Sequence, residues 1–294
     1  MLGEIAALVT ALLWSGTSIS FSEASVRIGA LQLNITRLFL AAVFLSVTIF
    51  LAGFSYDLTE RQIMFLAISG FVGFIFGDSF LFRAFKEIGP RMGMLLMSLV
   101  PAISSILAFF FLDEILRWID VAGIVITITG IVIVVLERNP PDPTKYKASP
   151  RGIFYGTLGA LGQAVGLILA KFAFEEGDMN GFVATFVRVF AAFLLFLPLG
   201  IISKRYKNPV PIYRKDPKAL LFTISGSILG PFLGVTGSLI AISNAKIGIA
   251  STLMATVPIM MLPLVRIIYK QRLTKAAILG AGIAVVGVAI LFLE

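Results

Sequence analysis

The chain contains no cysteine and no histidine. The absence of cysteine excludes disulfides, thiolate nucleophiles and covalent haem attachment. The absence of histidine removes the side chain that most often serves as a general base or as a ligand for transition metals. Charged residues are also scarce, at 14% of 294 residues, whereas a typical soluble domain has about 25%. We therefore expect neither a metal nor a cofactor, and the composition excludes an ordinary water-soluble enzyme.

Hydrophobic residues are abundant instead. They make up 58% of the chain, and the mean hydropathy is +0.99. The apolar runs are continuous and do not alternate with polar residues, which excludes an outer-membrane barrel. Glycine and proline, at 27 and 13 residues, are also more frequent in transmembrane helices than in soluble ones. The sequence predicts an all-α integral membrane protein.

The net charge of +8 has a simple explanation in such a protein, because basic residues concentrate in cytoplasmic loops. We therefore expect no nucleic-acid partner. The first residues, Met1 to Glu4, include no basic segment of the kind that opens a signal peptide. The first hydrophobic segment is predicted to be a retained span.

Ten segments are long and apolar enough to cross a bilayer, which takes about 20 residues per helix. Two longer connections interrupt them, at residues 137–151 and 203–218. The first of these divides the chain into predicted halves of five helices each, residues 1–138 and 152–294, joined by a linker at 139–151. The predicted spans are 4–22, 31–51, 62–82, 92–112, 118–136, 152–172, 181–202, 219–241, 248–269 and 274–293.

The basic residues are distributed unequally between the two sides of the membrane. Of the 22 Lys and Arg residues in the loops, 18 lie on the side opposite the termini and four lie on the side of the termini. The positive-inside rule then places both termini outside the cytoplasm.

The second half repeats features of the first. A shift of 157 residues superimposes residues 82–136 on residues 239–293 without a gap, and it pairs Pro101 with Pro258 and Met97 with Met254. The glycines at 123 and 130 pair in the same way with those at 280 and 287. Because each half has an odd number of spans, the two halves must cross the membrane in opposite senses. Inverted repeats are the architecture of alternating access, which predicts a transporter.

These features resemble the EamA family of the drug/metabolite transporter superfamily. The resemblance rests on the two five-helix halves, on Arg37-Leu-Phe-Leu-Ala-Ala, and on the stretch from Phe85 to Gly130 that includes Asp113-Glu114. It implies a ten-helix, multi-pass carrier of amino acids or other small metabolites in the inner (plasma) membrane. It also implies a central cavity lined by helices 1, 3, 4, 6, 8 and 9, with helices 5 and 10 packed away from it.

Three ionisable residues lie well inside the predicted spans. Arg37 and Arg188 occupy equivalent positions in the second and seventh spans. They either bind a substrate carboxylate or phosphate, for which a guanidinium offers a bidentate fork, or they cap helix carbonyls and reach the headgroups. Asp78 is the acidic residue available to carry a coupled proton; its alternative role is an ion pair with Arg83 or with an arginine of a neighbouring helix.

Other candidates are uncharged. By the resemblance, Trp14 and Gln163 face the cavity at equivalent positions, where they either bind substrate or pack as ordinary core residues. Met97 and Met254 form matched apolar surfaces that suit either a permissive pocket or simple packing. Pro101 and Pro258 are predicted to kink their helices as gating hinges, or as static bends.

Small residues form one smooth face on each of the predicted helices 5 and 10. Gly123, Thr127 and Gly130 lie on the first, and Gly280, Ala284 and Gly287 on the second. Such faces let helices approach closely, which predicts packing between these helices or a homodimer through them. The chain is thus expected to be a monomer or a homodimer.

The function that these features favour is a secondary active transporter of small metabolites, and we expect an exporter. A membrane enzyme would need paired carboxylates, an activated nucleophile or a metal cluster within the spans, and the sequence has none there. A channel-like or lipid-moving protein without alternating access is the remaining alternative.

Overall fold

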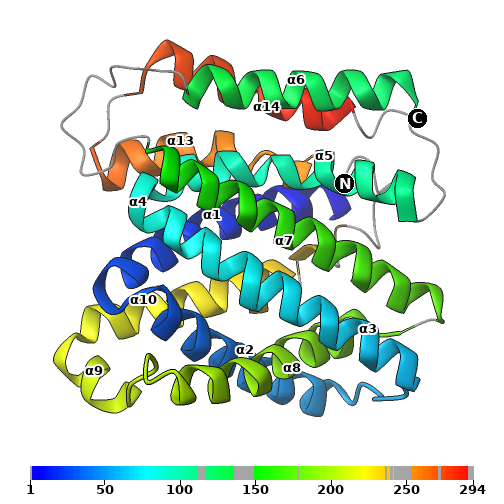
Figure 1. Cartoon of the computed structure of the whole chain (residues 1–294), viewed down its shortest axis with the longest axis vertical. Coiled ribbons are helices and arrows are strands. Elements are labelled where there is room, and N and C mark those ends of the chain that lie inside the picture. The colour runs from blue at the N-terminus through cyan, green and yellow to red at the C-terminus, as the bar shows by residue number, and fades with distance from the viewer. Residues whose placement is uncertain are drawn as a thin grey trace.

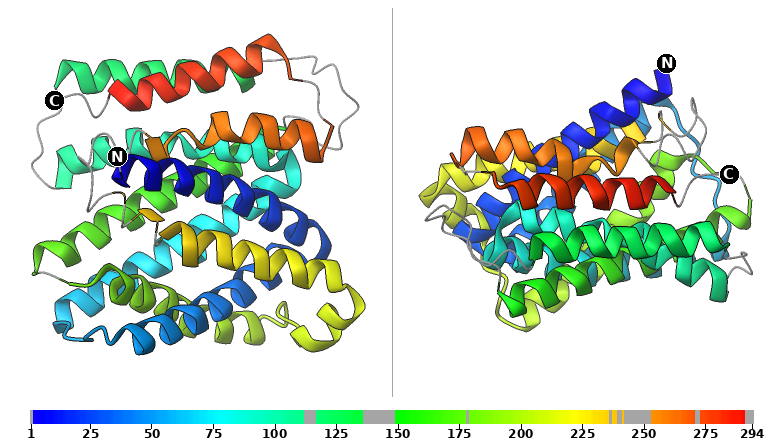
Figure 2. Two further views of the ribbon diagram at one scale, coloured as in Figure 1. Left: turned by 180° about the vertical axis from the view of Figure 1, so that it is seen from behind. Right: turned by 90° about the horizontal axis from the view of Figure 1, so that it is seen from above.

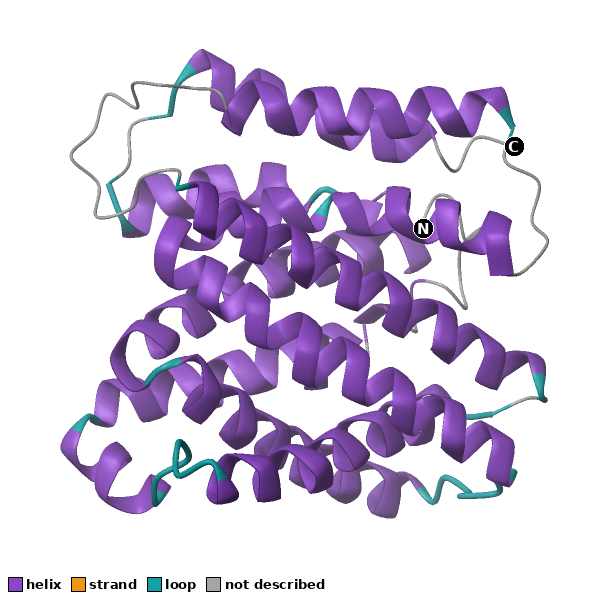
Figure 3. Cartoon of the chain, viewed as in Figure 1, coloured by secondary structure: helices purple, strands orange, loops and turns teal. Residues whose placement is uncertain are grey.

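The structure is a computed structural model that describes residues 2–111, 117–135, 149–177, 179–235, 237–238, 241, 253–270 and 273–290. Within these residues the regular secondary structure is entirely helical (Figure 3). The helices of the first part are α1 (Leu2–Ile28), α2 (Ala30–Ala52), α3 (Glu60–Gly70), η1 (Phe71–Gly77), α4 (Asp78–Met97), α5 (Leu99–Phe111) and α6 (Trp118–Val135). Those of the second part are α7 (Pro150–Glu175), α8 (Gly181–Ile202), α9 (Pro209–Lys215), α10 (Pro217–Ser227), η2 (Ile228–Gly234), α13 (Val257–Ile268) and α14 (Lys275–Ile290). The segments η1 and η2 are π-helices.

Five helical segments are long and apolar enough to cross a bilayer. Several shorter apolar helices accompany them, among them α6, α13 and α14. The predicted class, an all-helical membrane protein, therefore agrees with the structure, while the count of ten spans remains a prediction. The five long segments are Leu2–Ile28, Ala30–Ala52, Glu60–Met97, Pro150–Glu175 and Gly181–Ile202.

The longest of these segments contains a sharp break. Gly89 has φ +77°, a backbone conformation that favours glycine, and Pro90 follows it. The helix therefore continues to Ile88, six residues beyond the predicted end of the third span at 82. Its last turns are amphipathic: Arg83 and Lys86 are exposed, whereas Phe85 is buried. A span that ends at residue 82 would leave those charged residues in a loop, but the structure places them on the outer face of a continuing helix.

The segment at 203–218 also differs from its prediction as a plain connection, because it contains helix α9. The side chain of Asn208 accepts a hydrogen bond from Val210 N at 3.0 Å. Pro209 occupies the first turn, where a backbone N–H would have no partner within the helix. Two hydrogen bonds with Gln32 of α2, one to each backbone polar atom of Lys207, tie the segment to the bundle.

Two interrupted helices have the same design. The pair α3 and η1 spans residues 60–77, and the pair α10 and η2 spans residues 217–234, so both are offset by the 157 residues found in the sequence. Each begins at an equivalent N-cap: Thr59 accepts from Gln62 N at 3.2 Å, and Asp216 accepts from Ala219 N at 3.1 Å. Each changes from α- to π-geometry after eleven residues.

The helices of the two parts pack crosswise. Helix α1 lies against α10 and η2, and α7 lies correspondingly against α3 and η1. Helices α2 and α8 pack together at one end of the molecule, and α6 and α14 pack together at the opposite end (Figures 1 and 2). Each of these contacts therefore joins a helix of one part to a helix of the other. The interrupted helices lie between the α2–α8 layer and the α6–α14 layer.

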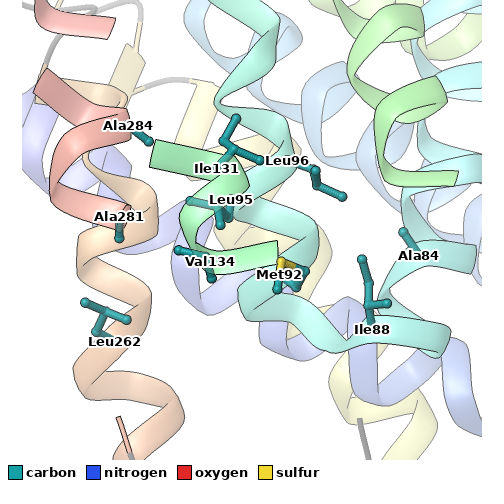
Figure 4. Close-up of a cluster of buried hydrophobic side chains, with 10 residues drawn as sticks. All are labelled: Ala84, Ile88, Met92, Leu95, Leu96, Ile131, Val134, Leu262, Ala281 and Ala284. Carbon is teal, nitrogen blue, oxygen red and sulfur yellow. The ribbon is translucent and has the colours of Figure 1, made fainter. Parts of the chain in front are cut away.

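Helices α6 and α14 make the close contact that their small residues predict. A Cβ atom added to Gly130 would lie 2.4 Å from the backbone nitrogen of Ala284, and one added to Gly287 would lie 2.3 Å from that of Thr127. This face is therefore buried between two helices of one chain, and the oligomeric state remains a prediction. Below it, Ile131 and Val134 of α6 join a core cluster with side chains of α4, α13 and α14 (Figure 4).

Candidate functional site

A buried ion pair joins the second helix to the end of η1. Arg37 of α2 donates from Nη2 to Oδ2 of Asp78, the first residue of α4. The two residues are 5% and 6% exposed. A charge buried in a membrane protein needs a partner of opposite sign, and each of these residues supplies it to the other. Neither sequence-based role for Arg37 alone, capping carbonyls or reaching headgroups, describes this arrangement.

The Arg37 guanidinium is held from several sides. Its Nε donates to Oδ1 of Asn34 at 2.9 Å, and Asn34 in turn donates to the carbonyl of Phe74 at 2.8 Å. Its Cζ lies 5.0 Å from the ring centroid of Phe82 and 5.8 Å from that of Phe74, within cation–π range. These contacts fix Arg37 in one orientation.

Asp78 is also held from helix α7. Gln163 donates from Nε2 both to Oδ1 of Asp78 and, at 3.2 Å, to the carbonyl of Gly73. Glycines let the helices approach closely enough for these bonds: a Cβ added to Gly162 would lie 2.7 Å from the Cα of Gly77. The alternative role predicted for Asp78, an ion pair with an arginine of a neighbouring helix, describes its pair with Arg37. The other suggested partner, Arg83, lies over the rings of Phe80 and Tyr155.

The second arginine, Arg188 of α8, approaches the same place but is bonded differently. Its Cζ lies 4.9 Å from the ring centroid of Phe74. The carboxylate of Asp78 attracts its guanidinium electrostatically. Its Nε is buried and has no hydrogen-bond partner within the described part of the chain. The structure thus brings Arg37, Arg188, Asp78 and Gln163 together around η1, with one carboxylate for two guanidinium groups.

The described residues at the corresponding place in the second half are uncharged. Trp14 of α1 lies against η2, and a Cβ added to Gly234 would come within 2.5 Å of its indole nitrogen. Met254 packs against Trp14 in the same cluster. Val235 follows η2 where Asp78 follows η1. Trp14 and Gln163 therefore occupy equivalent positions beside the two π-helices, but the carboxylate belongs to one half only.

The two prolines predicted as kinks lie just after helix breaks. Helix α4 ends at Met97 and α5 begins at Leu99, while the turn at 255–256 precedes α13. Pro101 and Pro258 stand in the first turns of α5 and α13, where a missing N–H leaves no internal bond unmade. A proline disturbs a helix on its N-terminal side, because its ring crowds the carbonyl four residues earlier. The breaks at residue 98 and at 255–256 therefore agree with the predicted kinks, and the role of gating hinge stays a prediction. Met97 and Met254 are the last residues before these breaks.

Several residues of this site were missed by the sequence analysis. Asn34 lies one turn before Arg37, a spacing at which side chains meet on a helix, so its contact could have been inferred. Phe74 and the two π-helices carry no comparable signal, because an apolar run with glycines is equally typical of an ordinary span. The described residues contain no cluster of acidic side chains that could hold a metal ion.

Comparisons with known proteins bear on these features. The model of the EamA-like transporter family matches residues 1–136 and 150–293. The chain is 22% identical to "Uncharacterized transporter YetK" of Bacillus subtilis (strain 168) over 294 residues, which cover 98% of this chain and 86% of that protein. A crystal structure with 17% sequence identity matches with a TM-score of 0.68 and covers 98% of this chain and 95% of its own, which shows a shared fold.

Proposed function

We propose that this chain, which belongs to the EamA-like transporter family, is a secondary active transporter that moves small metabolites by alternating access. The family match confirms the resemblance found in the sequence, and it makes the chain a membrane transporter. The more specific proposal is an exporter of amino acids or organic anions in the inner (plasma) membrane.

The observation that carries this proposal is the pair of equivalent interrupted helices. The α3–η1 and α10–η2 segments share length, cap and π-helical register, and each packs on the first long helix of the other part. This arrangement supports ten spans in two inverted halves, residues 1–138 and 152–294, with 139–151 as a linker. Two equivalent units that meet at a shared site can rock against each other and open that site to either side of the membrane.

The substrate site of this proposal lies between the π-helices. Arg188 and Gln163 provide polar contacts beside η1, where Arg37 bonds to Asp78, while Trp14 provides an aromatic surface beside η2. Met254 packs with Trp14, and Met97 packs against the cluster that contains Phe21 and Phe82. Both methionines are the proposed adaptable apolar walls of the site. A small molecule with one polar end and one apolar end suits such a site.

Asp78 is the proposed proton carrier. Its carboxylate balances Arg37 and accepts from Gln163, so protonation would weaken two contacts that join η1 to helices α2 and α7. Binding and release of a proton at this one position would then be coupled to the packing of the interrupted helix. The breaks before Pro101 and Pro258 are the proposed hinges, because a chain that has already left helical geometry bends there at little energetic cost.

A channel-like or lipid-moving function is the alternative, and countertransport separates it from a carrier. A metabolite that raises the melting temperature of the protein is chosen first, because such a rise indicates binding. The protein is then reconstituted into vesicles, some of which are preloaded with the unlabelled metabolite. A carrier takes up the labelled metabolite faster into preloaded vesicles, since the loaded site returns faster than the empty one. Equal uptake with and without preloading would indicate a channel and would contradict the proposal.

A further inference from the structure

We propose that Arg188, and not Arg37, is the cation that binds the substrate, and that the group it binds is a carboxylate. This inference rests on the proposed transport function, because it names the recognition chemistry of the same site. The sequence presents the two arginines as equivalent. The structure distinguishes them.

Arg37 already has its partners within the protein. It donates from Nη2 to Asp78 and from Nε to Asn34, and three aromatic rings surround it. The carboxylate that balances the charge of Arg37 is thus one that the chain itself provides. Arg37 is therefore a structural residue whose charge is already balanced.

Arg188 has no such partner in the described part of the chain. Its Nε is buried without a hydrogen bond, and the described ion pairs do not include it. The charge that acts on it, that of Asp78, is already committed to Arg37. The group of two guanidiniums and one carboxylate thus keeps one positive charge unbalanced, and a membrane interior strongly favours an anion beside such a charge.

The orientation of Arg188 suits an anion. The Cζ atom of Arg188 lies over the ring of Phe74, 4.9 Å from the ring centroid and within cation–π range. Stacking on a ring occupies the face of a guanidinium and leaves its N–H donors free in the plane, where they match the two oxygens of a carboxylate. A point-like cation such as lysine would not offer this fork.

Gly73 lies next to the free donors and leaves space there. A Cβ added to Gly73 would lie 3.7 Å from Nη2 of Arg188 and 3.7 Å from Oε1 of Gln163, with no closer atom. Nη2 of Arg188 and Oε1 of Gln163 are therefore separated by at most twice 3.7 Å. Gln163 uses Nε2 for its bonds to Asp78 and Gly73, and its Oε1 accepts no hydrogen bond from the described residues. A donor and an acceptor thus face the same small space.

Two kinds of ligand share the required carboxylate. A simple carboxylic acid would use Arg188 alone, whereas a zwitterionic amino acid would also place its ammonium group near Oε1 of Gln163. Sets of three compounds with the same side chain distinguish them. One such set is L-leucine, 4-methylpentanoate, which lacks the amine, and 3-methylbutylamine, which lacks the carboxylate. L-phenylalanine, 3-phenylpropionate and 2-phenylethylamine form a second set, and L-alanine, propionate and ethylamine form a third.

The experiment measures the affinity of these compounds for the purified full-length protein from the rise in its melting temperature. We expect at least one compound with a carboxylate to bind and its amine counterpart not to bind. Arg188→Gln should weaken the binding of that compound roughly 10- to 100-fold, the range expected when a hydrogen bond to a charged group is lost. Arg188→Lys should restore only part of the loss.

Gly73→Ala provides a second variant that keeps Arg188 in place. Its methyl group enters the space between Arg188 and Gln163 without a close contact, so it should weaken carboxylate binding while the protein stays folded. The matched control for it is Gly282→Ala on α14, where a Cβ would meet nothing within 4 Å. Arg205→Gln, at an exposed position, is the control for the loss of an arginine. Neither control should change affinity.

The inference would be overturned if no carboxylate bound, if the amines bound as well as the carboxylates, or if Arg188→Gln and Gly73→Ala bound carboxylates as the controls do. These outcomes are separate from a failure of the proposed function. A protein that exchanges an amine by countertransport would be a carrier without a carboxylate site. A protein that binds carboxylates through Arg188 but shows no countertransport would keep the site and lose the proposed mechanism.

Discussion

The ion pair between Arg37 and Asp78 allows a sharp test of the difference between the two arginines. Arg37→Gln leaves the buried carboxylate without the guanidinium that bonds to it, and Asp78→Asn leaves two guanidiniums without a carboxylate. Because the two residues are 5% and 6% exposed, we expect either substitution to lower the free energy of unfolding by about 3–5 kcal/mol.

The double variant is expected to behave differently. In Arg37→Gln with Asp78→Asn both charges are absent, and the two amides can still bond to Asn34 and Gln163. Replacing a buried ion pair by neutral groups often has little effect on stability. We therefore expect the double variant to be more stable than either single variant. The two single effects should thus be strongly non-additive, as in a double-mutant cycle of contacting residues.

Arg188→Gln is the comparison within the same cluster. Arg188 makes no ion pair in the described structure and has an unbonded Nε, so its loss should change the stability of the ligand-free protein by less than about 1 kcal/mol or should increase it. Thermal unfolding of all four variants in the same lipid or detergent measures the differences. A harmless Arg37→Gln, or a double variant as unstable as the sum of the singles, would refute the assignment of Arg37 as structural.

Three further predictions concern other parts of the molecule. The 18 to 4 distribution of basic residues predicts that a reporter active only in the cytoplasm is silent when fused after Glu294 and active when inserted near Asn208. A bright fusion after Glu294 would contradict that orientation. If Asp78 carries the coupled proton, vesicles with the double variant Arg37→Gln, Asp78→Asn should exchange substrate but should not accumulate it in response to a pH gradient. Accumulation equal to that of the unaltered protein would exclude Asp78 as the proton carrier. Gly130→Ala should destabilise the protein by about 1–3 kcal/mol, because its methyl group would overlap the backbone of Ala284. Gly282→Ala, the control, should have little effect. Equal stability of the two variants in thermal unfolding would show that the α6–α14 contact is not close.

The fold could be predicted from the sequence wherever hydrophobicity decides the structure. Continuous apolar runs predicted the helices, and the small residues of α6 and α14 predicted their close packing. Boundaries were less predictable. The helix that ends at Ile88 and the short helix α9 contain charged residues, which mark a loop in a hydropathy pattern but can equally cover the exposed face of a helix.

The candidate site could be predicted only in part. Arg37, Arg188 and Asp78 are recognisable because ionisable side chains are rare within apolar spans, and the repeat identified Trp14 with Gln163. No feature of the sequence favours Arg37 over Arg83 as the partner of Asp78. That choice depends on η1, whose π-geometry sets the direction of Asp78, and on the glycines that bring α7 close enough for Gln163 to reach it. Such three-dimensional causes leave no periodic pattern in the chain.

The central claim is that two equivalent halves open the same site to opposite sides in turn, and accessibility labelling tests it most directly. Because the chain has no cysteine, Met97→Cys and Met254→Cys each introduce a unique thiol, just before the equivalent helix breaks of the two halves. The measurement is the rate at which a membrane-impermeant maleimide, added to one side of reconstituted vesicles, labels each thiol with and without a bound metabolite. Alternating access predicts that the metabolite raises the labelling rate of one thiol and lowers that of the other. A change in the same direction at both thiols, or no change at either, would contradict the account.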